Sequence, residues 1–466
     1  MYRGALVPRV VLRQRRANAA AASMRHGAEF SVIGSSREDA LFSYIARSKV
    51  ATSRYLVLAL LTGAYVLSVI DRGIISVVLT DVQNEFSLND TQLALLGGTA
   101  FALFYATLGI PIARLADRSN RRIILAASII VWSAATALSG VTAGFWSLFL
   151  TRVFVGAGEA GCTPTSHSLI TDYFRKGELA RALGVYSAGA IIGMLSGFLL
   201  GSVLAQHFGW RTVFIALGIP GLLFGAVVVL IVRDPRYDSP GVASAPPRLD
   251  VPLRESLGDL LGNPIYRAAL FGHGFSLVCF YALFVWIYPL VERSFELSKT
   301  AIGQYTALAL LFGAIPGMVL GGLLTDRMAA YNIRWRGWLP AFWVLVSTPL
   351  YYATLAADTA SLLFIWFGLF AFCINMHHAA AFSIVQIAAK DHQRALAVAM
   401  VLLVSNLLGY AALPVVAGYL SDTVFRDMGA NSIRYGLAVV GLASLVGTSF
   451  FLLAARALGR QRIADG

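Results

Sequence analysis

The sequence predicts an all-α integral membrane protein with twelve transmembrane helices in two pseudo-symmetric halves of six. Composition is the first reason: of the 466 residues, 58% are hydrophobic and only 13% are charged, which is too little polar material to cover a water-exposed surface. Length is the second, because the apolar residues fall in runs of about 20 or more, as a helix needs to cross a hydrocarbon core of about 30 Å. Lipid must therefore cover much of the protein.

The apolar runs also divide the chain into regions. The longest polar interruption, 233–264, is rich in proline, which disfavours helix. We expect it to be a cytoplasmic linker between six-helix bundles at 55–232 and 265–458, with cytoplasmic tails at 1–54 and 459–466. The expected spans are 55–80, 91–114, 122–143, 145–170, 180–206, 211–232, 265–292, 300–325, 338–357, 360–388, 395–421 and 432–458.

The positive charge follows the predicted membrane topology. A net charge of +13 would suggest nucleic-acid binding if the basic side chains formed one patch. Instead, most Lys and Arg fall in the tails and in the alternate loops that share a side with them. The positive-inside rule then places both termini in the cytoplasm. We expect a multi-pass protein of the cell (inner) membrane, with no nucleic-acid partner.

Neither a metal site nor a cofactor is expected. Cys162, Cys279 and Cys373 all fall in apolar spans, without a disulfide or metal-ligand spacing. An intramembrane enzyme is the main alternative class, and it would need a nucleophile with a base, paired aspartates or a zinc motif such as His-Glu-x-x-His. None is present, since His377 and His378 are adjacent rather than four residues apart. We therefore expect no enzymatic activity.

Matching short motifs at equivalent loops of the two halves indicate an internal repeat. Asp117-Arg118 follows the second span and Asp326-Arg327 follows the eighth, while Arg181-Ala182-Leu183 and Arg394-Ala395-Leu396 occupy equivalent loops. Parallel repeats of this kind are a known transporter architecture.

The first of these loops resembles a family signature. The stretch 114–122 resembles the Gly-x-x-x-Asp-Arg-x-Gly-Arg-Arg loop of the major facilitator superfamily, and 322–327 resembles its second-half counterpart. The chain departs from the signature at Ala113 and Asn120, and Asn tolerates a left-handed turn nearly as well as Gly. The resemblance implies the major facilitator fold and a transport function.

A narrower resemblance involves the first and fourth spans. Asp71-Arg72, together with Arg152-x-x-x-Gly156-x-Gly158-Glu159-Ala160, resembles the spinster-like transporters, as does the run from 172–174 through 209–211. It implies lipid-like substrates such as lysophospholipids or sphingoid phosphates. The organic-anion symporters of the same superfamily also place Asp-Arg and Gly-Glu-Ala in these helices, so proton-coupled uptake of a small organic anion is the alternative.

Four ionisable residues inside these spans are the leading candidates for the site. Such groups cost several kcal/mol in a bilayer unless they face a cavity and find partners. Asp71 and Glu159 are expected to exchange protons, as the resemblance also implies, and Arg72 and Arg152 to bind an anionic group. Arg152 and Glu159 are seven residues apart and share a helix face. The structural alternative is a set of permanent salt bridges between two helices.

The signature loop is expected to form a gate. Asp117 would pair with Arg121, or with a helix N-terminus across the two halves, and hold the inner side closed. The expected gating residues also include Arg118, Arg122, Asp326 and Arg327. Ordinary positive-inside topology would explain the arginines without explaining the aspartate among them.

The second half offers softer substrate-binding candidates: His273, Tyr281, Trp286, Asn375, His378 and Asn406. Hydrogen bonding between helices and the interfacial aromatic belt explain such residues equally well. A charged half facing an uncharged half suits an amphipathic substrate.

These observations lead to one functional expectation. The chain is expected to be a secondary active transporter, driven by a proton gradient, whose halves rock about a central site in alternating access. The sequence contains no nucleotide-binding loop, so direct use of ATP is not expected. Its expected partners are a lipid or other small-molecule substrate, protons and membrane lipids, and a monomer is expected.

Overall fold

The computed structural model describes residues 53–238, 252–390 and 393–464. The described residues all belong to one compact unit. The described residues contain helices and no strands. The predicted N-terminal tail lies almost entirely outside the described residues.

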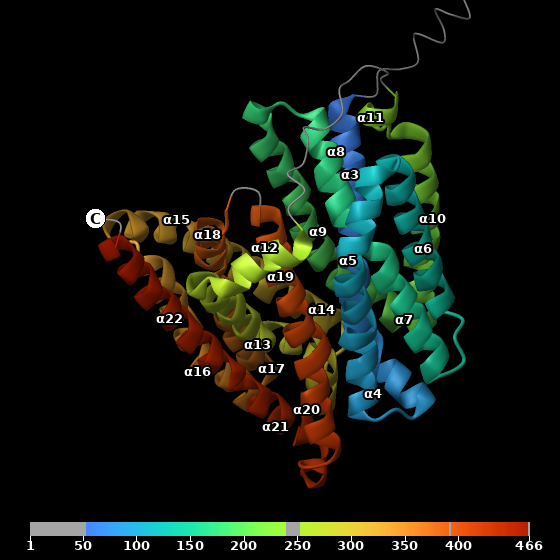
Figure 1. Cartoon of the computed structure of the whole chain (residues 1–466). Coiled ribbons are helices and arrows are strands. Elements are labelled where there is room, and N and C mark those ends of the chain that lie inside the picture. The colour runs from blue at the N-terminus through green and yellow to red at the C-terminus, as the bar shows by residue number, and fades with distance from the viewer. Residues whose placement is uncertain (1–52, 239–251, 391–392, 465–466) are drawn as a thin grey trace, which may run out of the picture. The chain divides into compact units, whose positions relative to one another are not determined.

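The helices follow the order that the apolar runs predict (Figure 1). Two short helices, α11 (Pro235–Asp238) and α12 (Leu253–Gly262), lie in the expected linker between the halves. The first half contains α3 (Arg54–Phe86), α4 (Asp90–Ala94), η1 (Leu95–Thr99), α5 (Ala100–Arg118), α6 (Arg121–Ser139), α7 (Phe145–Glu159), α8 (Cys162–Tyr173), α9 (Lys176–Phe208) and α10 (Trp210–Ile231). The second half contains α13 (Pro264–Ser294), α14 (Lys299–Ala309), η2 (Leu310–Ala314), α15 (Ile315–Tyr331), α16 (Trp335–Ala356), α17 (Ala360–Asn375), α18 (His378–Ala388), α19 (Arg394–Ser405), η4 (Asn406–Ala412), α20 (Leu413–Asp422), η5 (Arg426–Asn431), α21 (Ser432–Gly441) and α22 (Ala443–Ala464).

The fourth expected span is broken in the middle. Eleven helical stretches of the described residues are long and apolar enough to cross a membrane. The expected span at 145–170 instead consists of α7, with 15 residues, and α8, with 12 residues, separated by Ala160 and Gly161. Pro164 lacks an N–H and cannot bond to the carbonyl of Ala160, so the helix stops there. The tenth span is also interrupted, between α17 and α18 at Met376 and His377.

Small residues bring the helices of the first half close together. Gly189, Gly193, Gly197 and Gly201 recur every fourth residue along one face of α9 and meet α3. A Cβ added at Gly193 would lie 2.6 Å from the carbonyl oxygen of Val66. Because apolar lipid gives helices no hydrophobic reason to associate, such close backbone packing stabilises the bundle.

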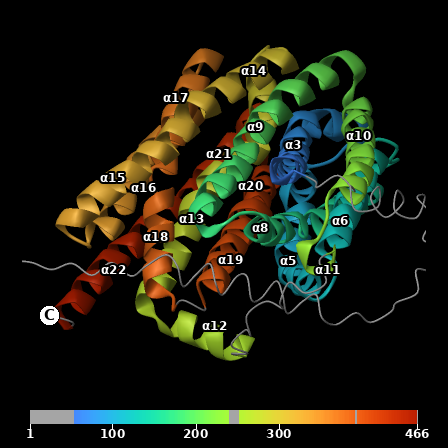
Figure 2. The same ribbon diagram turned by 90° about the horizontal axis from the view of Figure 1, so that it is seen from above.

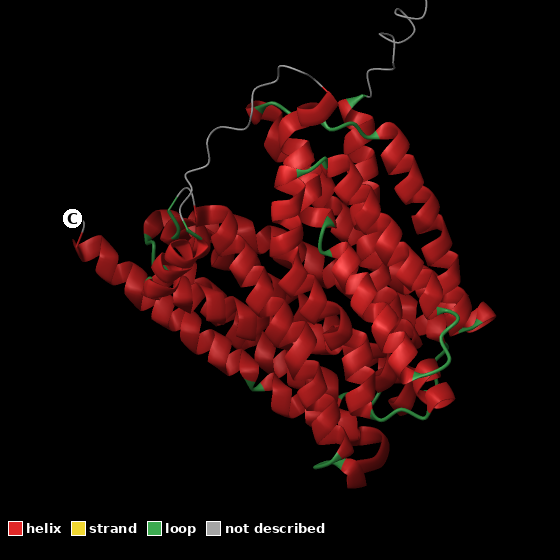
Figure 3. Ribbon diagram, turned by 45° about the vertical axis from the view of Figure 1, so that its right-hand side comes forward, coloured by secondary structure: helices red, strands yellow, loops and turns green. Residues whose placement is uncertain are grey.

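The two halves meet along their first helices and at one end. Figure 2 shows α6 and α10 of the first half and α15 and α16 of the second half at opposite sides, with α3 packed against α13 and α9 against α14 between them. We call the end where α3 stops and α4 begins the Asp90 end, and the opposite one the Arg121 end. Figures 1 and 3 show the helices of the two halves running together toward the Asp90 end.

Polar contacts join the halves at the Asp90 end. Arg293, near the end of α13, forms an ion pair of 2.5 Å with Asp90 of α4. Asp422, the last residue of α20, accepts hydrogen bonds from the backbone N–H groups of Asp90, at 3.0 Å, and Thr91, at 2.8 Å. Lys299 of α14 lies 3.2 Å from Asp81 of α3. The carboxylate of Asp422 therefore caps α4 of the other half, where the helix dipole favours negative charge.

Candidate functional site

The four predicted charged residues lie together, as two ion pairs between α3 and α7. Arg152 Nη1 lies 2.9 Å from Asp71 Oδ2, and Arg72 Nη2 lies 2.9 Å from Glu159 Oε2. Asp71, Arg152 and Glu159 are 3%, 1% and 0% exposed. Arg152 and Glu159 share a helix face, as their spacing predicts, but each finds its partner on α3.

The Asp71–Arg152 pair is enclosed within the first half. The hydroxyl of Thr136 on α6 donates a hydrogen bond of 2.6 Å to Asp71 Oδ1. A small cavity beside Asp71 is lined by Trp132 of α6 and Gly218 of α10. These contacts tie α3, α6 and α7 together. The surroundings of this pair are therefore those expected of a permanent salt bridge between helices.

The Arg72–Glu159 pair differs because its arginine is partly accessible. The side chain of Arg72 is 19% exposed, and its guanidinium lies over the rings of Phe101 and Tyr105, at 4.9 and 4.5 Å. Glu159 Oε2 accepts hydrogen bonds from Ser68 Oγ, at 2.7 Å, and Arg72 Nε, at 2.9 Å. Its other oxygen, Oε1, is buried and has no hydrogen-bond partner among the described residues.

Aromatic rings connect Arg72 to the second half. Phe101 lies 6.3 Å from Tyr410, which lies 5.2 Å from Tyr281 and 6.0 Å from Phe284, measured between ring centroids. Tyr281 was a predicted candidate, whereas Tyr410 was missed. Tyr410 lies in η4, a π-helical segment, and such segments are frequent at functional sites.

η1 and η4 approach each other closely at this place. A Cβ at Gly98 would overlap the carbonyl oxygen of Tyr410, and Thr99 Oγ1 donates a hydrogen bond of 2.6 Å to the carbonyl of Ala411. The glycine pair at 97–98 was the only sequence signal for this contact.

The remaining second-half candidates are not gathered at one place. Asn375 and Asn406 each donate a hydrogen bond of 2.8 Å to a carbonyl one turn earlier in their own helix. Trp286 is buried, and its Nε1 donates to the carbonyl of Pro414 at 3.2 Å. His273 and His378 belong to a separate cluster inside the second half, which also contains His377.

At the Arg121 end, the arginine of the signature loop is fully buried. Arg121 Nη2 lies 2.5 Å from Asp234 Oδ1 and 2.7 Å from Asp172 Oδ2, and Nη1 donates to the carbonyl of Ser168 at 3.0 Å. Burial acts to raise the pKa of Asp234, but hydrogen bonds from Arg121 and the backbone outweigh it and hold the pKa below its usual value. Ser168 and Asp172 lie in the first half and Asp234 lies at the start of the expected linker, and neither aspartate was a predicted gating residue.

The other predicted gating residues lie around the same end of each half. Arg118 is the last residue of α5 and is exposed, as are Asp326 and Arg327 near the end of α15. Arg122 is half-buried. The side chain of Asp117 lies outside the described part of the structure, although its backbone belongs to α5.

Comparison with known proteins agrees with this architecture. The sequence model of the Major Facilitator Superfamily matches residues 61–407. An MFS-type efflux pump of Mycolicibacterium smegmatis is 28% identical over 403 residues, covering 86% of this chain and 92% of the pump. Protein spinster homolog 1 of Xenopus laevis is 29% identical over 434 residues, covering 85% and 79%.

A solved structure extends the similarity to three dimensions. A bacterial homolog of the human lysosomal transporter spinster, in an inward-facing and unoccupied conformation, superposes with a TM-score of 0.79 at 28% identity, over 87% of this chain and 98% of that one. The family model covers most of the predicted spans in both halves. The chain therefore belongs to the Major Facilitator Superfamily of membrane transporters and, within it, resembles the spinster proteins.

Proposed function

We propose that this transporter is a proton-coupled secondary carrier of an amphipathic, lipid-like or other small organic substrate, and that it works by alternating access. The observation that carries the proposal is the Arg72–Glu159 pair. Glu159 is a buried carboxylate with one oxygen that has no hydrogen-bond partner in the described part of the chain, and a partly exposed arginine holds it. It can be released when an anionic substrate group binds the same arginine. Protonation of Glu159 then removes the uncompensated charge.

The aromatic surroundings of Arg72 support the choice of substrate class. Phe101 and Tyr105 on one half and Tyr410 on the other place aromatic rings next to a positive charge, and Phe101 and Tyr410 are buried in this structure. Such a combination fits a molecule with an anionic head and an apolar tail, because guanidinium groups bind anions and rings bury hydrocarbon.

The coupling role of Asp71 and the substrate role of Arg152 remain part of the proposal. Asp71 is adjacent in sequence to Arg72, so a shift of α3 that opens one pair strains the other. The contacts at the Asp90 end support a cycle in which this end is closed while the Arg121 end admits substrate. We place the protein in the cell membrane with both termini in the cytoplasm, on the basis of its charge distribution.

Glu159→Gln tests the coupling directly. A thermal-shift screen of lysolipids against organic acids first identifies a ligand, because ligand binding stabilises the folded protein. Proteoliposomes are then given a pH gradient, and uptake of that ligand is measured beside a pH-sensitive dye. We expect the variant to bind the ligand but to lose gradient-driven uptake and the associated proton flux by about 10-fold or more.

Ser68→Ala is the matched control, because it removes one hydrogen bond to Glu159 and keeps the carboxylate. It should retain gradient-driven uptake. Uptake and proton flux at the parent's level and pH dependence in Glu159→Gln would contradict the proposal.

A further inference from the structure

Three imidazoles meet inside the second half, at the break between α17 and α18. His273 projects from α13, and His377 and His378 occupy the break. The ring centroids of the three histidines are 5.0, 4.8 and 5.0 Å apart, and one ring nitrogen of each lies within 4.8 Å of the others. His273 and His377 are buried, and His378 is half-buried.

The hydrogen bonds of His377 fix which of its nitrogens is available. Its Nδ1 lies against the carbonyl of Ile374, which can only accept a hydrogen bond, so Nδ1 carries the proton. The lone pair of Nε2 then points into the cluster, where Nε2 lies 3.0 Å from His273 Nδ1. Metal-ligating histidines almost always donate their other N–H to a carbonyl or carboxylate in this way.

Two further ring nitrogens of the cluster lack partners. His273 Nε2 and His378 Nδ1 are buried without a hydrogen bond to any described residue. Buried polar atoms are normally hydrogen-bonded, and an unpaired one costs about 1–3 kcal/mol. Hydrogen bonds among the described residues therefore leave these two ring nitrogens unsatisfied.

The spacing of the rings is that of a shared ion. With Zn–N bonds of about 2.0–2.1 Å in tetrahedral geometry, three imidazole rings have centres roughly 5 Å apart. The observed centroid distances of 4.8 to 5.0 Å match this value. We propose that His273, His377 and His378 bind a transition-metal ion of the class that prefers imidazole, such as Zn²⁺.

The place of this site in the fold suggests what the ion does. The break at 376–377 in the second half corresponds to the break at 160–161 that follows Glu159 in the first half. An ion at His273, His377 and His378 ties α13 to this interrupted helix. The partly exposed His378 gives the ion a route of entry and leaves a coordination position for water or an anion.

Metal content measured on purified protein tests the site. The protein is purified with an affinity tag that contains no histidine, stripped with a chelator, incubated with equimolar Zn²⁺, desalted and measured by mass spectrometry for metal. We expect about one zinc per chain in the parent, and at least about 10-fold weaker binding in His378→Gln, which loses a direct ligand. His207→Gln, an exposed histidine outside the cluster, should bind as the parent does.

A spectroscopic measurement covers the case in which a variant does not fold. Co²⁺ added to the parent should give the visible absorption bands of a tetrahedral nitrogen-ligated ion, which Zn²⁺ displaces. Absence of these bands from the parent, absence of retained zinc, or equal retention by the parent and a folded His378→Gln would each overturn the proposal.

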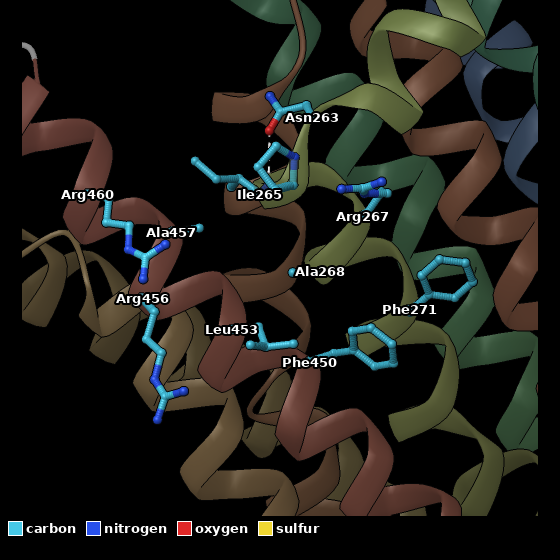
Figure 4. A pocket seen from close by; sticks show the side chains of 11 residues that line it. Asn263, Ile265, Arg267, Ala268, Phe271, Phe450, Leu453, Arg456, Ala457 and Arg460 are labelled. Carbon is cyan, nitrogen blue, oxygen red and sulfur yellow. Dashed lines mark hydrogen bonds between the residues drawn. The ribbon is translucent and has the colours of Figure 1, made fainter.

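A second, independent feature is a basic groove at the Arg121 end of the second half. Figure 4 shows this cavity, of about 800 Å³, between α13 and α22. Arg267 from α13 and Arg456 and Arg460 from α22 edge it, and Phe271 and Phe450 lie one or more turns deeper along the same helices. The described residues that line it include no acid.

We infer that this groove holds the phosphate headgroup of an anionic membrane phospholipid, with the acyl chains against the two phenylalanines. Basic pockets between transmembrane helices on the positively charged side of a membrane protein suit such headgroups. Three exposed arginines supply the charge, with no carboxylate among the described lining residues, and the apolar wall below them continues toward the membrane interior.

Lipid retention tests the groove. Delipidated parent protein is mixed with cardiolipin or phosphatidylcholine and examined by native mass spectrometry. We expect preferential retention of cardiolipin, reduced about 10-fold in the variant with Arg267, Arg456 and Arg460 changed to Gln, because each arginine contributes to the attraction of the anionic headgroup. The Arg114→Gln, Arg175→Gln variant removes exposed charge at the same end of the first half and should retain the preference.

Inorganic phosphate at millimolar concentration should not displace the lipid, since it lacks the acyl chains. Displacement by phosphate would show a free-anion site and overturn the lipid assignment. Equal retention of cardiolipin by parent and triple variant, or equal retention of both lipids by the parent, would do the same.

Discussion

Asp71 and Glu159 are both buried carboxylates paired with arginine, yet their surroundings differ. Asp71 is held by Arg152 and Thr136 inside the first half. Glu159, beside the partly exposed Arg72, has one oxygen without a partner among the residues that the structure describes. The sequence placed both residues inside predicted spans, where an ionisable group needs a partner. It did not show which arginine pairs with which acid, since that depends on the rotation of α3 against α7.

Asp71→Asn distinguishes a proton site from a counter-ion. The change leaves Arg152 buried without a charged partner, which costs about 3–5 kcal/mol, so we expect a lower unfolding temperature. Adding Arg152→Gln should restore most of the stability, because the two amides can hydrogen-bond, while gradient-driven transport should remain lost. Thermal unfolding and proteoliposome uptake measure the two effects. Parental transport and pH dependence in the double variant would show that Asp71 serves only as a counter-ion.

Whole elements were more predictable than their interruptions. Run lengths predicted where the helices lie but not the breaks within them, because an apolar stretch in lipid satisfies its backbone hydrogen bonds by forming a helix. The break at 160–161 was missed because the run 145–170 has the length of one span, and only its glycines and Pro164 marked the interruption. The histidine cluster was missed for a related reason: His273 and His377 are 104 residues apart, so no local spacing reveals their contact.

The buried network of Arg121, Asp172 and Asp234 gives an element-scale prediction about pH. The pKa of Asp234 is held below its usual value, so its ionised form stabilises the folded state above the unfolded pKa near 3.8. This stability is lost as pH falls through the lower, folded-state pKa. We therefore expect Asp234→Asn to lower the unfolding temperature at neutral pH, with the difference from the parent shrinking below about pH 4.

Thermal unfolding of the detergent-solubilised protein across this pH range checks the prediction. Arg236 also pairs with Asp172, at 2.9 Å, but is itself one-third exposed, so Arg236→Gln should have a much smaller effect. A pH-independent difference between the parent and Asp234→Asn would contradict the proposed role of ionisation.

For the whole molecule, the polar contacts at the Asp90 end are expected to set the balance between conformations. Asp90→Asn weakens the ion pair with Arg293 that joins the halves, so it should increase the fraction of molecules open at this end. The measurement uses a variant without native cysteines and with Ser76→Cys, a buried position where α3 meets Val285 of the other half. We expect faster labelling by a membrane-impermeant maleimide from the side that the Asp90 end faces.

The matched control for this change is Glu85→Gln. Glu85 also pairs with an arginine near the Asp90 end, but its partner, Arg211, belongs to the same half. Labelling should therefore stay at the parental rate in this variant. An unchanged rate in Asp90→Asn, with the protein still folded, would mean that the pair contributes to stability without controlling the opening.

The substrate class can be tested through the same central site, since a lipid and a small anion depend differently on Arg72. A small organic anion obtains most of its binding energy from charge and hydrogen bonds, so loss of the arginine should nearly abolish its binding. For an amphipathic lipid, each buried methylene contributes up to about 0.8 kcal/mol, so a long tail sustains binding after the head contact is lost. Because Glu159 is the partner of Arg72, the clean variant is Arg72→Ala with Glu159→Gln, which leaves no unpaired buried charge. We expect the affinity for a homologous series of acyl lysolipids to rise with chain length in both the parent and this variant. A flat series in the parent would instead identify a small organic anion as the substrate.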